Sequence, residues 1–134
     1  MPTCTIPMVN NRFLPVAAVS LPAPAHPVNR RYHALVDTGA MKTMISARVV
    51  QEVGLPQVDI GTYFDVNENE EETGVYRLRM DLPIDLPHGS ELRGAELDAL
   101  LMKASPPAFD IIWGMDFLSM FHITMVFGQL HISS

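Results

Sequence analysis

The chain has 134 residues, of which 48% are hydrophobic and 18% are charged, and this composition excludes an intrinsically disordered tail. The 9 Lys and Arg residues against 15 Asp and Glu residues give a net charge of −6, which argues against nucleic acid or an anionic membrane surface as a partner. The length predicts a single domain over residues 1–134, and the one cysteine, Cys4, excludes an internal disulfide and fits a reducing compartment.

The N-terminal segment is apolar and rich in proline, and two interpretations are open. Residues 13–25 end in Ala-x-Ala, which resembles a signal-peptide cleavage site. Only Arg12 supplies a positive charge before this run and prolines interrupt it, so we favour two short strands within residues 5–21, around a turn at residues 9–12. No apolar stretch approaches the ~20 residues of a membrane span, and we expect a cytoplasmic protein with no membrane partner.

Proline and glycine recur at short intervals, with 11 and 8 copies, and the segments between them are short. This spacing predicts an all-β domain with little helix. Strands are expected at residues 31–37, 74–84, 96–103 and 109–114, with a final hairpin at residues 122–133. Residues 96–103 are also compatible with a helix, because short apolar runs do not distinguish the two, and we favour a strand from the pattern of its neighbours.

Two helical segments interrupt this β pattern. Residues 46–56 begin with a serine that can cap a helix, carry valines at helical spacing, and end with a glycine and a proline. A second, short helix is expected at residues 115–121, begun by Asp116.

A run of acidic residues lies between Asp65 and Gly74. Its simplest interpretation is a solvated hairpin tip, and it would matter for function only if that hairpin covered a site. The run contains Glu68, Glu70, Glu71 and Glu72.

Motifs for other kinds of chemistry are missing from the sequence. There is no glycine-rich phosphate loop, no G-x-S-x-G nucleophile elbow and no H-E-x-x-H motif. The histidines lack the spacing of metal ligands, and the nine methionines are spread over many elements in the manner of core residues. We therefore expect neither a metal nor a cofactor.

Asp37 stands at the end of an apolar run, in the string ALVDTGA at residues 34–40. Asp-Thr-Gly is by itself a common turn. Together with DIIWGMDFL at residues 110–118, however, it resembles the retroviral-type aspartic proteases, the retropepsins, and particularly their single-domain bacterial relatives. In that family a hydrophobic strand delivers Asp-Thr-Gly-Ala, and a later strand that ends in glycine crosses behind it. The resemblance implies a closed all-β fold with one or two short helices, a homodimer and a polypeptide substrate.

The resemblance also implies roles for residues around the motif. Asp37 would be the catalytic carboxylate, and the hydroxyl of Thr38 would bond across to the partner loop. Gly39 would allow the tight turn and the close approach of substrate, and Ala40 completes the active-site loop. Strand alternation would turn Ile112 toward the site and leave Trp113 in the core.

A flap that excludes water is expected from the hairpin at residues 63–76. Its returning limb carries Thr73 and Gly74, which we expect to contribute to the substrate pocket. The acidic run lies at the tip of this hairpin.

One carboxylate is too few for the reaction. Attack by water on an amide needs a base for the water and an acid for the carbonyl oxygen, and two facing carboxylates that share one proton supply both. The sequence holds no second Asp-Thr-Gly or Asp-Ser-Gly. A two-fold homodimer, with one Asp37 from each chain, is the economical solution.

Two positions depart from the retroviral pattern. The residue after Asp-Thr-Gly-Ala is usually Asp and the residue after the late glycine is usually Arg, and these two form an ion pair. Here they are Met41 and Met115, so an apolar contact between the two side chains is expected in place of the pair.

The sequence thus predicts an aspartic endopeptidase. The alternative is a non-proteolytic module of the same fold that serves in dimerisation or peptide binding, since fold does not settle function. A monomeric scaffold with a chance turn motif is a third possibility, which a dimer in solution would exclude.

Overall fold

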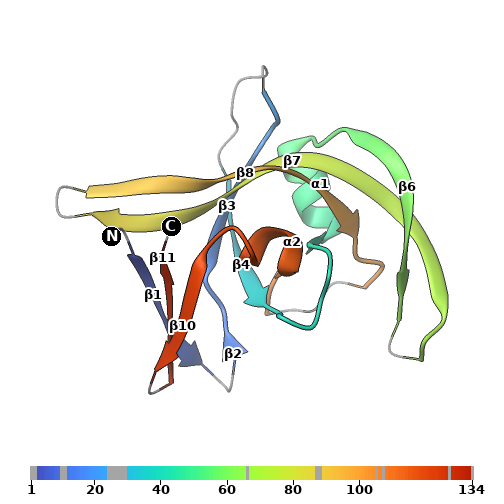
Figure 1. The fold of residues 1–134 in the computed structure, drawn as a ribbon. Coiled ribbons are helices and arrows are strands. Elements are labelled where there is room, and N and C mark those ends of the chain that lie inside the picture. The colour runs from blue at the N-terminus through green and yellow to red at the C-terminus, as the bar shows by residue number, and fades with distance from the viewer. Residues whose placement is uncertain are drawn as a thin grey trace.

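The computed structural model describes residues 3–9, 12–23, 30–65, 67–86, 89–104, 106, 108–126 and 128–133. These residues form eleven strands and two short helices (Figure 1). The elements are β1 (Thr3–Val9), β2 (Arg12–Phe13), β3 (Val16–Ser20), β4 (Arg30–Val36), β5 (Met44–Ile45), α1 (Ala47–Val53), β6 (Gln57–Phe64), β7 (Glu70–Leu86), β8 (Gly89–Leu101), β9 (Ile111–Trp113), α2 (Met115–Leu118), β10 (His122–Val126) and β11 (Gln129–Ser133). In the described part of the chain, no helix is long and apolar enough to cross a membrane.

Six strands close into a barrel. They follow the order β7-β3-β4-β9-β5-β8, and β8 pairs with β7 again, which closes the ring. The paired β7 and β8 form a long twisted ribbon that crosses the whole molecule in Figure 1. On one side of the ring the sheet continues from β7 through β1 and β11 to β10, so that the first and last strands of the chain lie together.

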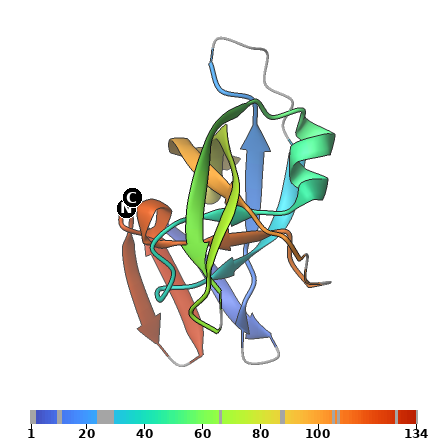
Figure 2. The same ribbon diagram turned by 90° about the vertical axis from the view of Figure 1, so that its right-hand side faces the viewer.

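The other half of β7 pairs with β6 to form a separate hairpin. The pairing runs from Gln57 opposite Tyr76 to Phe64 opposite Glu70, with an irregularity between Gln57 and Asp59. Figure 2 shows this hairpin, the β6–β7 hairpin, standing at the near side of the barrel.

The core fills the barrel and continues under α2. Leu78, Met80 and Ile111 are fully buried between the strands. Trp113 is also fully buried, and its ring lies 4.9 Å from that of Phe117 on α2, measured between the centroids. Aromatic stacking therefore attaches α2 directly behind the strand that carries the late glycine motif.

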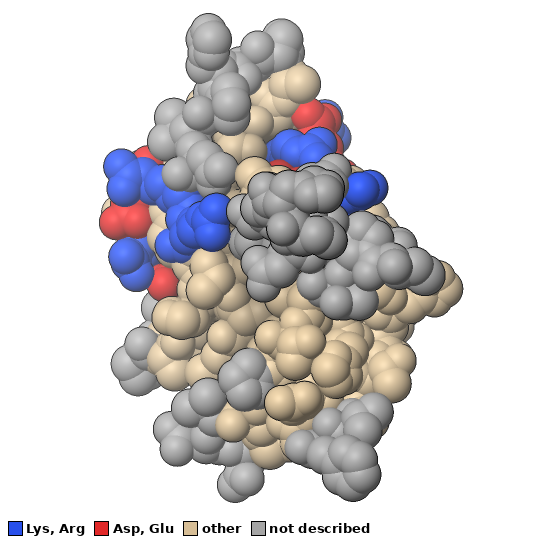
Figure 3. Space-filling model, turned by 90° about the vertical axis from the view of Figure 1, so that its left-hand side faces the viewer, with Lys and Arg blue, Asp and Glu red and all other residues tan. Residues whose placement is uncertain are grey.

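Helix α1 is held by polar contacts with Asp110, which precedes β9, and by the hydrogen bond that Tyr32 on β4 donates to Glu52. The hydroxyl of Ser46 accepts a hydrogen bond from the backbone N–H of Val49, as a capping serine does, and donates to the carboxylate of Asp110. Arg48 forms ion pairs with Asp110 and Glu52 at 2.9 and 3.3 Å. Figure 3 shows basic and acidic side chains next to one another on the upper part of one face.

The expected elements agree with the structure, with shifts at their ends. The strand predicted at residues 31–37 is β4, and the capped helix predicted at residues 46–56 is α1. The strand favoured at residues 96–103 is part of β8, which begins earlier, at Gly89. The short helix, α2, and the final hairpin, β10–β11, are also present.

The N-terminal prediction falls partly within the described residues. The second of the two expected strands is divided into β2 (Arg12–Phe13) and the barrel strand β3 (Val16–Ser20), of which residues 17–20 are buried. The centre of the turn predicted at residues 9–12 lies outside the described residues, as does the end of the signal-like run at residues 24–25.

The hydroxyl of Tyr32 on β4 should make the stability of the fold sensitive to alkaline pH. Burial, together with a 2.9 Å hydrogen bond to the carboxylate of Glu52, raises the pKa of Tyr32 to about 12. An unfolded tyrosine has a pKa near 10, so the stabilisation is complete below pH 10 and is lost as the pH rises toward 12. Between pH 10 and 12 the unfolding free energy of wild type should fall by about 1–2 kcal/mol more than that of Tyr32→Phe. This magnitude includes a reduction because solvent around Glu52 screens the interaction. Urea unfolding of both proteins at pH 8 to 11.5 measures this, and parallel curves would contradict it.

Candidate active site

The two sequence motifs meet at the ends of parallel strands. β4 and β9 run side by side, with Val36 opposite Trp113 as their last pair. The backbone N–H of Asp37 donates to the carbonyl oxygen of Trp113 at 3.1 Å. The strand pairing therefore delivers Asp37 and Gly114 to the same point of the barrel, 77 positions apart in the sequence.

The turn after β4 holds the carboxylate of Asp37. The backbone N–H of Gly39 donates to Asp37 Oδ1 at 2.9 Å, and the N–H of Ala40 donates to the Asp37 carbonyl oxygen at 3.2 Å. A β-carbon on residue 39 would lie 3.3 Å from Oδ1, closer than side-chain carbons normally approach, so glycine leaves the carboxylate room. Asp37 is half-buried, while Thr38 and Gly39 are exposed.

The far end of this turn is tied to α2 by the carboxylate of Asp116. Asp116 Oδ1 accepts hydrogen bonds from the backbone N–H and the hydroxyl of Thr43, at 2.9 and 2.7 Å. Thr43 is fully buried, so both of its donors would otherwise lack a partner. Its hydroxyl oxygen also accepts from the N–H of Gly114 at 3.2 Å. We call this set the Thr43–Asp116 clamp.

Gly114 is required by the closeness of the two chain segments. A β-carbon at position 114 would lie 2.5 Å from the carbonyl carbon of Lys42 and 2.6 Å from its oxygen, which is closer than such atoms can come. The backbone of residues 40 and 41 also accepts hydrogen bonds from the N–H groups of Met115 and Asp116. The active-site loop is thus held against the start of α2 along its length.

A pocket of about 400 Å³ opens beside the loop. Its floor is formed by residues 39–42 together with Met44 and Leu100. The facing wall is formed by residues 62–64 of β6. The lining is mainly apolar, and Phe64 and Met41 are exposed at 71% and 77% in the single chain.

The other predicted site residues occupy different positions relative to this pocket. Ile112 is half-buried, whereas Ile111 and Trp113 on either side are fully buried, so Ile112 belongs to the opposite face of β9. Thr73 and Gly74 lie on the returning limb of the β6–β7 hairpin, but they do not line the pocket. The hydroxyl of Thr73 donates to the carbonyl oxygen of Leu101 at 2.8 Å. The outgoing limb, residues 62–64, faces the loop instead.

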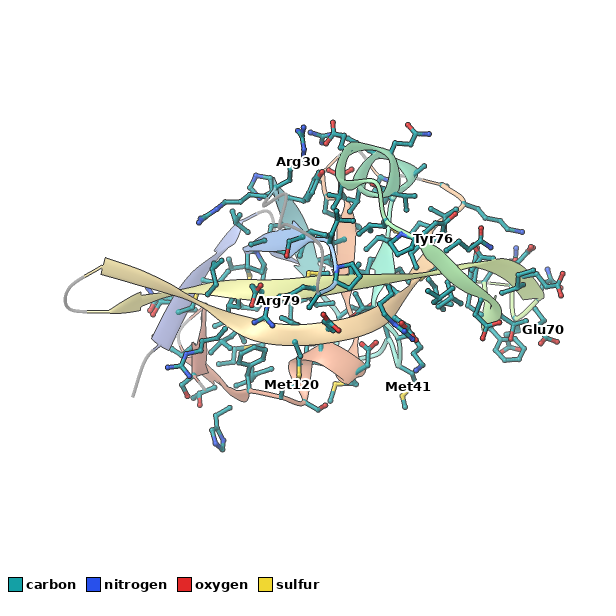
Figure 4. The ribbon with its side chains drawn as sticks, turned by 90° about the horizontal axis from the view of Figure 1, so that it is seen from above. Arg30, Met41, Glu70, Tyr76, Arg79 and Met120 are labelled. Atoms are coloured by element: carbon teal, nitrogen blue, oxygen red, sulfur yellow. The ribbon has the colours of Figure 1, made fainter. Side chains whose placement is uncertain are left out.

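The expected side-chain contact between Met41 and Met115 is wrong for the single chain. Met115 is half-buried against the core, whereas the side chain of Met41 is 77% exposed and points away from the body of the molecule in Figure 4. The link that an ion pair makes in the retroviral pattern is supplied here by backbone hydrogen bonds and by the clamp. The clamp uses the acid one position after Met115.

The contacts of two sets of residues in the site were not found from the sequence. Thr43 and Asp116 were missed as partners, although Asp116 was recognised as the start of a helix. A threonine six positions after Asp37 and an acid two positions after the late glycine were the available signals. Residues 63 and 64 belong to the flap predicted at residues 63–76, but the pocket contacts were expected from Thr73 and Gly74 on the other limb, whereas residues 62–64 line the pocket.

Comparisons with known proteins give the family and the fold of the chain. Residues 27–120 match the family described as gag-polyprotein putative aspartyl protease, and this range contains both motifs. The structure is similar to the crystal structure of a retropepsin-like aspartic protease from Rickettsia conorii, with a TM-score of 0.60 over 97% of this chain and 89% of that chain. The two sequences are 14% identical, so the likeness shows a shared retropepsin-like fold. No curated protein matches the chain.

The Thr43–Asp116 clamp should be a main contributor to stability. Asp116→Ala leaves two buried donors of Thr43 without a partner and should lower the unfolding free energy by about 2–3 kcal/mol. Asp116→Asn keeps one acceptor oxygen and should cost less. As a control, Asp98→Ala removes an acid from an exposed ion pair with Arg77 and should cost less than about 1 kcal/mol. Urea unfolding compares the three, and equal losses for Asp116→Ala and Asp98→Ala would show that the clamp contributes nothing special.

Proposed function

This chain belongs to the family of gag-polyprotein putative aspartyl proteases, and we propose that it is an aspartic endopeptidase that acts as a homodimer. The observation that carries the proposal is the placement of Asp37. Its carboxylate is held by the N–H of Gly39 where two strands end together, next to a pocket large enough for a side chain of a peptide.

The need for a second chain follows from the chemistry. The sequence contains one Asp-Thr-Gly, and hydrolysis of an amide by water needs a base and an acid at the same time. A two-fold axis that passes beside Asp37 brings the Asp37 carboxylates of the two chains together. The exposed Thr38 follows directly, so its hydroxyl is available for a hydrogen bond to the second chain.

The proposed reaction uses one water molecule between the two carboxylates. Aspartic proteases are the standard case in which two acids ~3 Å apart share one proton, because both cannot ionise cheaply at that distance. The ionised carboxylate takes a proton from the water as it attacks the carbonyl carbon. The protonated carboxylate gives its proton to the carbonyl oxygen, and a tetrahedral intermediate results. This chemistry requires no metal or cofactor.

Substrate would be covered by the β6–β7 hairpin. Its outgoing limb already faces the active-site loop across the pocket, and Thr73 and Gly74 on the returning limb would support that wall from behind. Ile112, on the face of β9 opposite the buried residues, would contact the substrate from the barrel side.

The alternative, a dimerisation or peptide-binding module without proteolysis, has one observation in its favour. The exposed Met41 and Phe64 give the loop and the hairpin an apolar surface that could hold a peptide without cleaving it. Incubation with an unstructured protein at mildly acidic pH separates the two functions. Cleavage that depends on Asp37 and is blocked by a peptide with a hydroxyl group in place of the scissile amide supports the enzyme.

The variant Asp37→Asn should abolish cleavage and preserve the dimer. The asparagine keeps the shape and the hydrogen-bonding capacity of the side chain, and it removes the repulsion between two ionised acids. In wild type, loss of the second proton is harder in the dimer than in the separated chains. Dimer stability from the shared proton is therefore present at low pH and is lost as the pH rises.

Sedimentation of both proteins from mildly acidic to neutral pH measures this difference. The wild-type dimer should weaken with rising pH more than the Asn variant does. Equal weakening would mean that the two acids do not share a site, and the proposed mechanism would then be wrong.

The acidic end of the hairpin should influence which peptides are cleaved. Glu68, Glu70 and Glu72 are exposed near the tip, and Figure 4 places Glu70 at the outer end of the hairpin. Their field should favour peptides with lysine at their ends over peptides with glutamate, and salt should weaken the preference. Cleavage rates of otherwise identical peptides at low and high salt measure this. Equal cleavage rates for the Lys and Glu peptides at low salt would mean that the acidic run is only a solvated hairpin tip, which is the simpler interpretation.

A further inference from the structure

The pocket beside Asp37 carries a single charged residue. Its lining combines Met44, Leu100 and residues 62–64 with residues 39–42 of the active-site loop, and Lys42 is the one charged residue among the described residues that line it. A mainly apolar pocket with one cation in its lining can distinguish between side chains that have the same shape and different charge.

Among the residues that the structure describes, none pairs with the ammonium of Lys42. The other lysine of the chain, Lys103, lies 2.8 Å from a carboxylate oxygen of Glu71, and Arg48, Arg77 and Arg79 are also paired with acids. In the ranges that the structure describes, no hydrogen bond or ion pair involves the Lys42 ammonium. An unpaired cation next to the catalytic loop is available to an anionic group from outside.

The backbone of Lys42 is nevertheless fixed. It passes so close to Gly114 that a β-carbon there would come within 2.9 Å of its nitrogen, and the clamp begins at the next residue, Thr43. The side chain therefore starts from a defined point on the pocket floor. From this fixed backbone, the flexible four-carbon stem of lysine can bring the ammonium to the edge of the pocket.

We propose that Lys42 is a specificity-determining residue that selects a substrate side chain bearing a carboxylate. This inference rests on the proposed function, and it names a class of substrate for that same site. The two methylene groups of a glutamate would lie against Met44 and Leu100, and its carboxylate would meet the Lys42 ammonium at the rim. Glutamine has the same shape without the charge, so it is the matched comparison.

A competing partner for Lys42 is the hairpin itself. Glu72 lies opposite Thr62 and Glu70 lies opposite Phe64, so these acids share a face with two pocket-lining residues. If the hairpin closed onto Lys42 through these acids, the lysine would support every substrate equally. If Lys42 selects substrates by charge, its replacement should change the ratio of the rates for Glu and Gln peptides. If Lys42 supports closure of the hairpin, its replacement should lower both rates equally.

The test uses the full chain and peptides that differ only by Glu or Gln at one position, scanned along both sides of the cleaved bond. At one position wild type should show a kcat/KM about three to five times higher for Glu, which corresponds to an exposed ion pair. Lys42→Gln should lose this preference, and Lys42→Glu should prefer a peptide with Lys there. High salt should reduce the wild-type preference. The control Arg31→Gln removes one positive charge at the other end of β4 and should keep it.

A binding measurement separates this inference from the proposed function. The Asp37→Asn chain, with and without Lys42→Gln, is titrated with the same labelled Glu and Gln peptides. If wild type cleaves no peptide and the Asp37→Asn chain binds the Glu peptide more tightly in a manner that needs Lys42, the endopeptidase proposal fails and the role of Lys42 stands. The proposed role of Lys42 is overturned if Glu and Gln peptides are cleaved alike at every position. It is also overturned if Lys42→Gln keeps the Glu preference or lowers both cleavage rates equally, or if the Asp37→Asn chain binds neither peptide.

Discussion

The hydrogen bonds from Thr43 to the carboxylate of Asp116 are the interaction on which the active-site loop depends. The pairing of β4 with β9 brings Asp37 to its place, but the chain then leaves the sheet and needs another support. A carboxylate that accepts two bonds from one buried residue supplies that support, since bonds to an ionised acceptor are stronger than bonds between neutral groups. Because Asp116 also lies in the first turn of α2, the same acid connects the loop to the helix and, through Phe117, to the aromatic core.

This arrangement divides the site into a fixed part and a part with more freedom. The loop with Asp37 lies against Gly114 with no space between them, so its position is set by the core. The β6–β7 hairpin is attached through β7, the Thr73–Leu101 hydrogen bond and the Lys103–Glu71 ion pair, and most of its outer strand β6 is exposed. Precise placement of the acid and a wall that can adapt to a substrate are both needed by an enzyme that cleaves polypeptides.

The sequence predicted the parts of this site that leave a local signal. The apolar run before Asp37, the alternation in residues 74–84 and the serine cap at Ser46 each follow from neighbouring residues, and the structure contains all three. β5 was missed because a strand of two residues has no period. The clamp joins residues 73 positions apart, and such a pairing leaves no periodic pattern. The contact between Met41 and Met115 was wrongly expected because the two methionines were assumed to keep the side-chain geometry of the ion pair that they replace. The structure instead joins these two segments by backbone hydrogen bonds.

The length of β7 connects parts of the molecule that would otherwise be independent. Its 17 residues belong first to the β6–β7 hairpin, then to the barrel, and at Asp85 they reach the sheet formed by the first and last strands of the chain. This one continuous strand therefore connects the hairpin, the barrel and the sheet of the terminal strands mechanically. A force applied to the hairpin would be transmitted along β7 to the first and last strands of the chain. A partner that binds those strands would in turn restrict the motion of the hairpin.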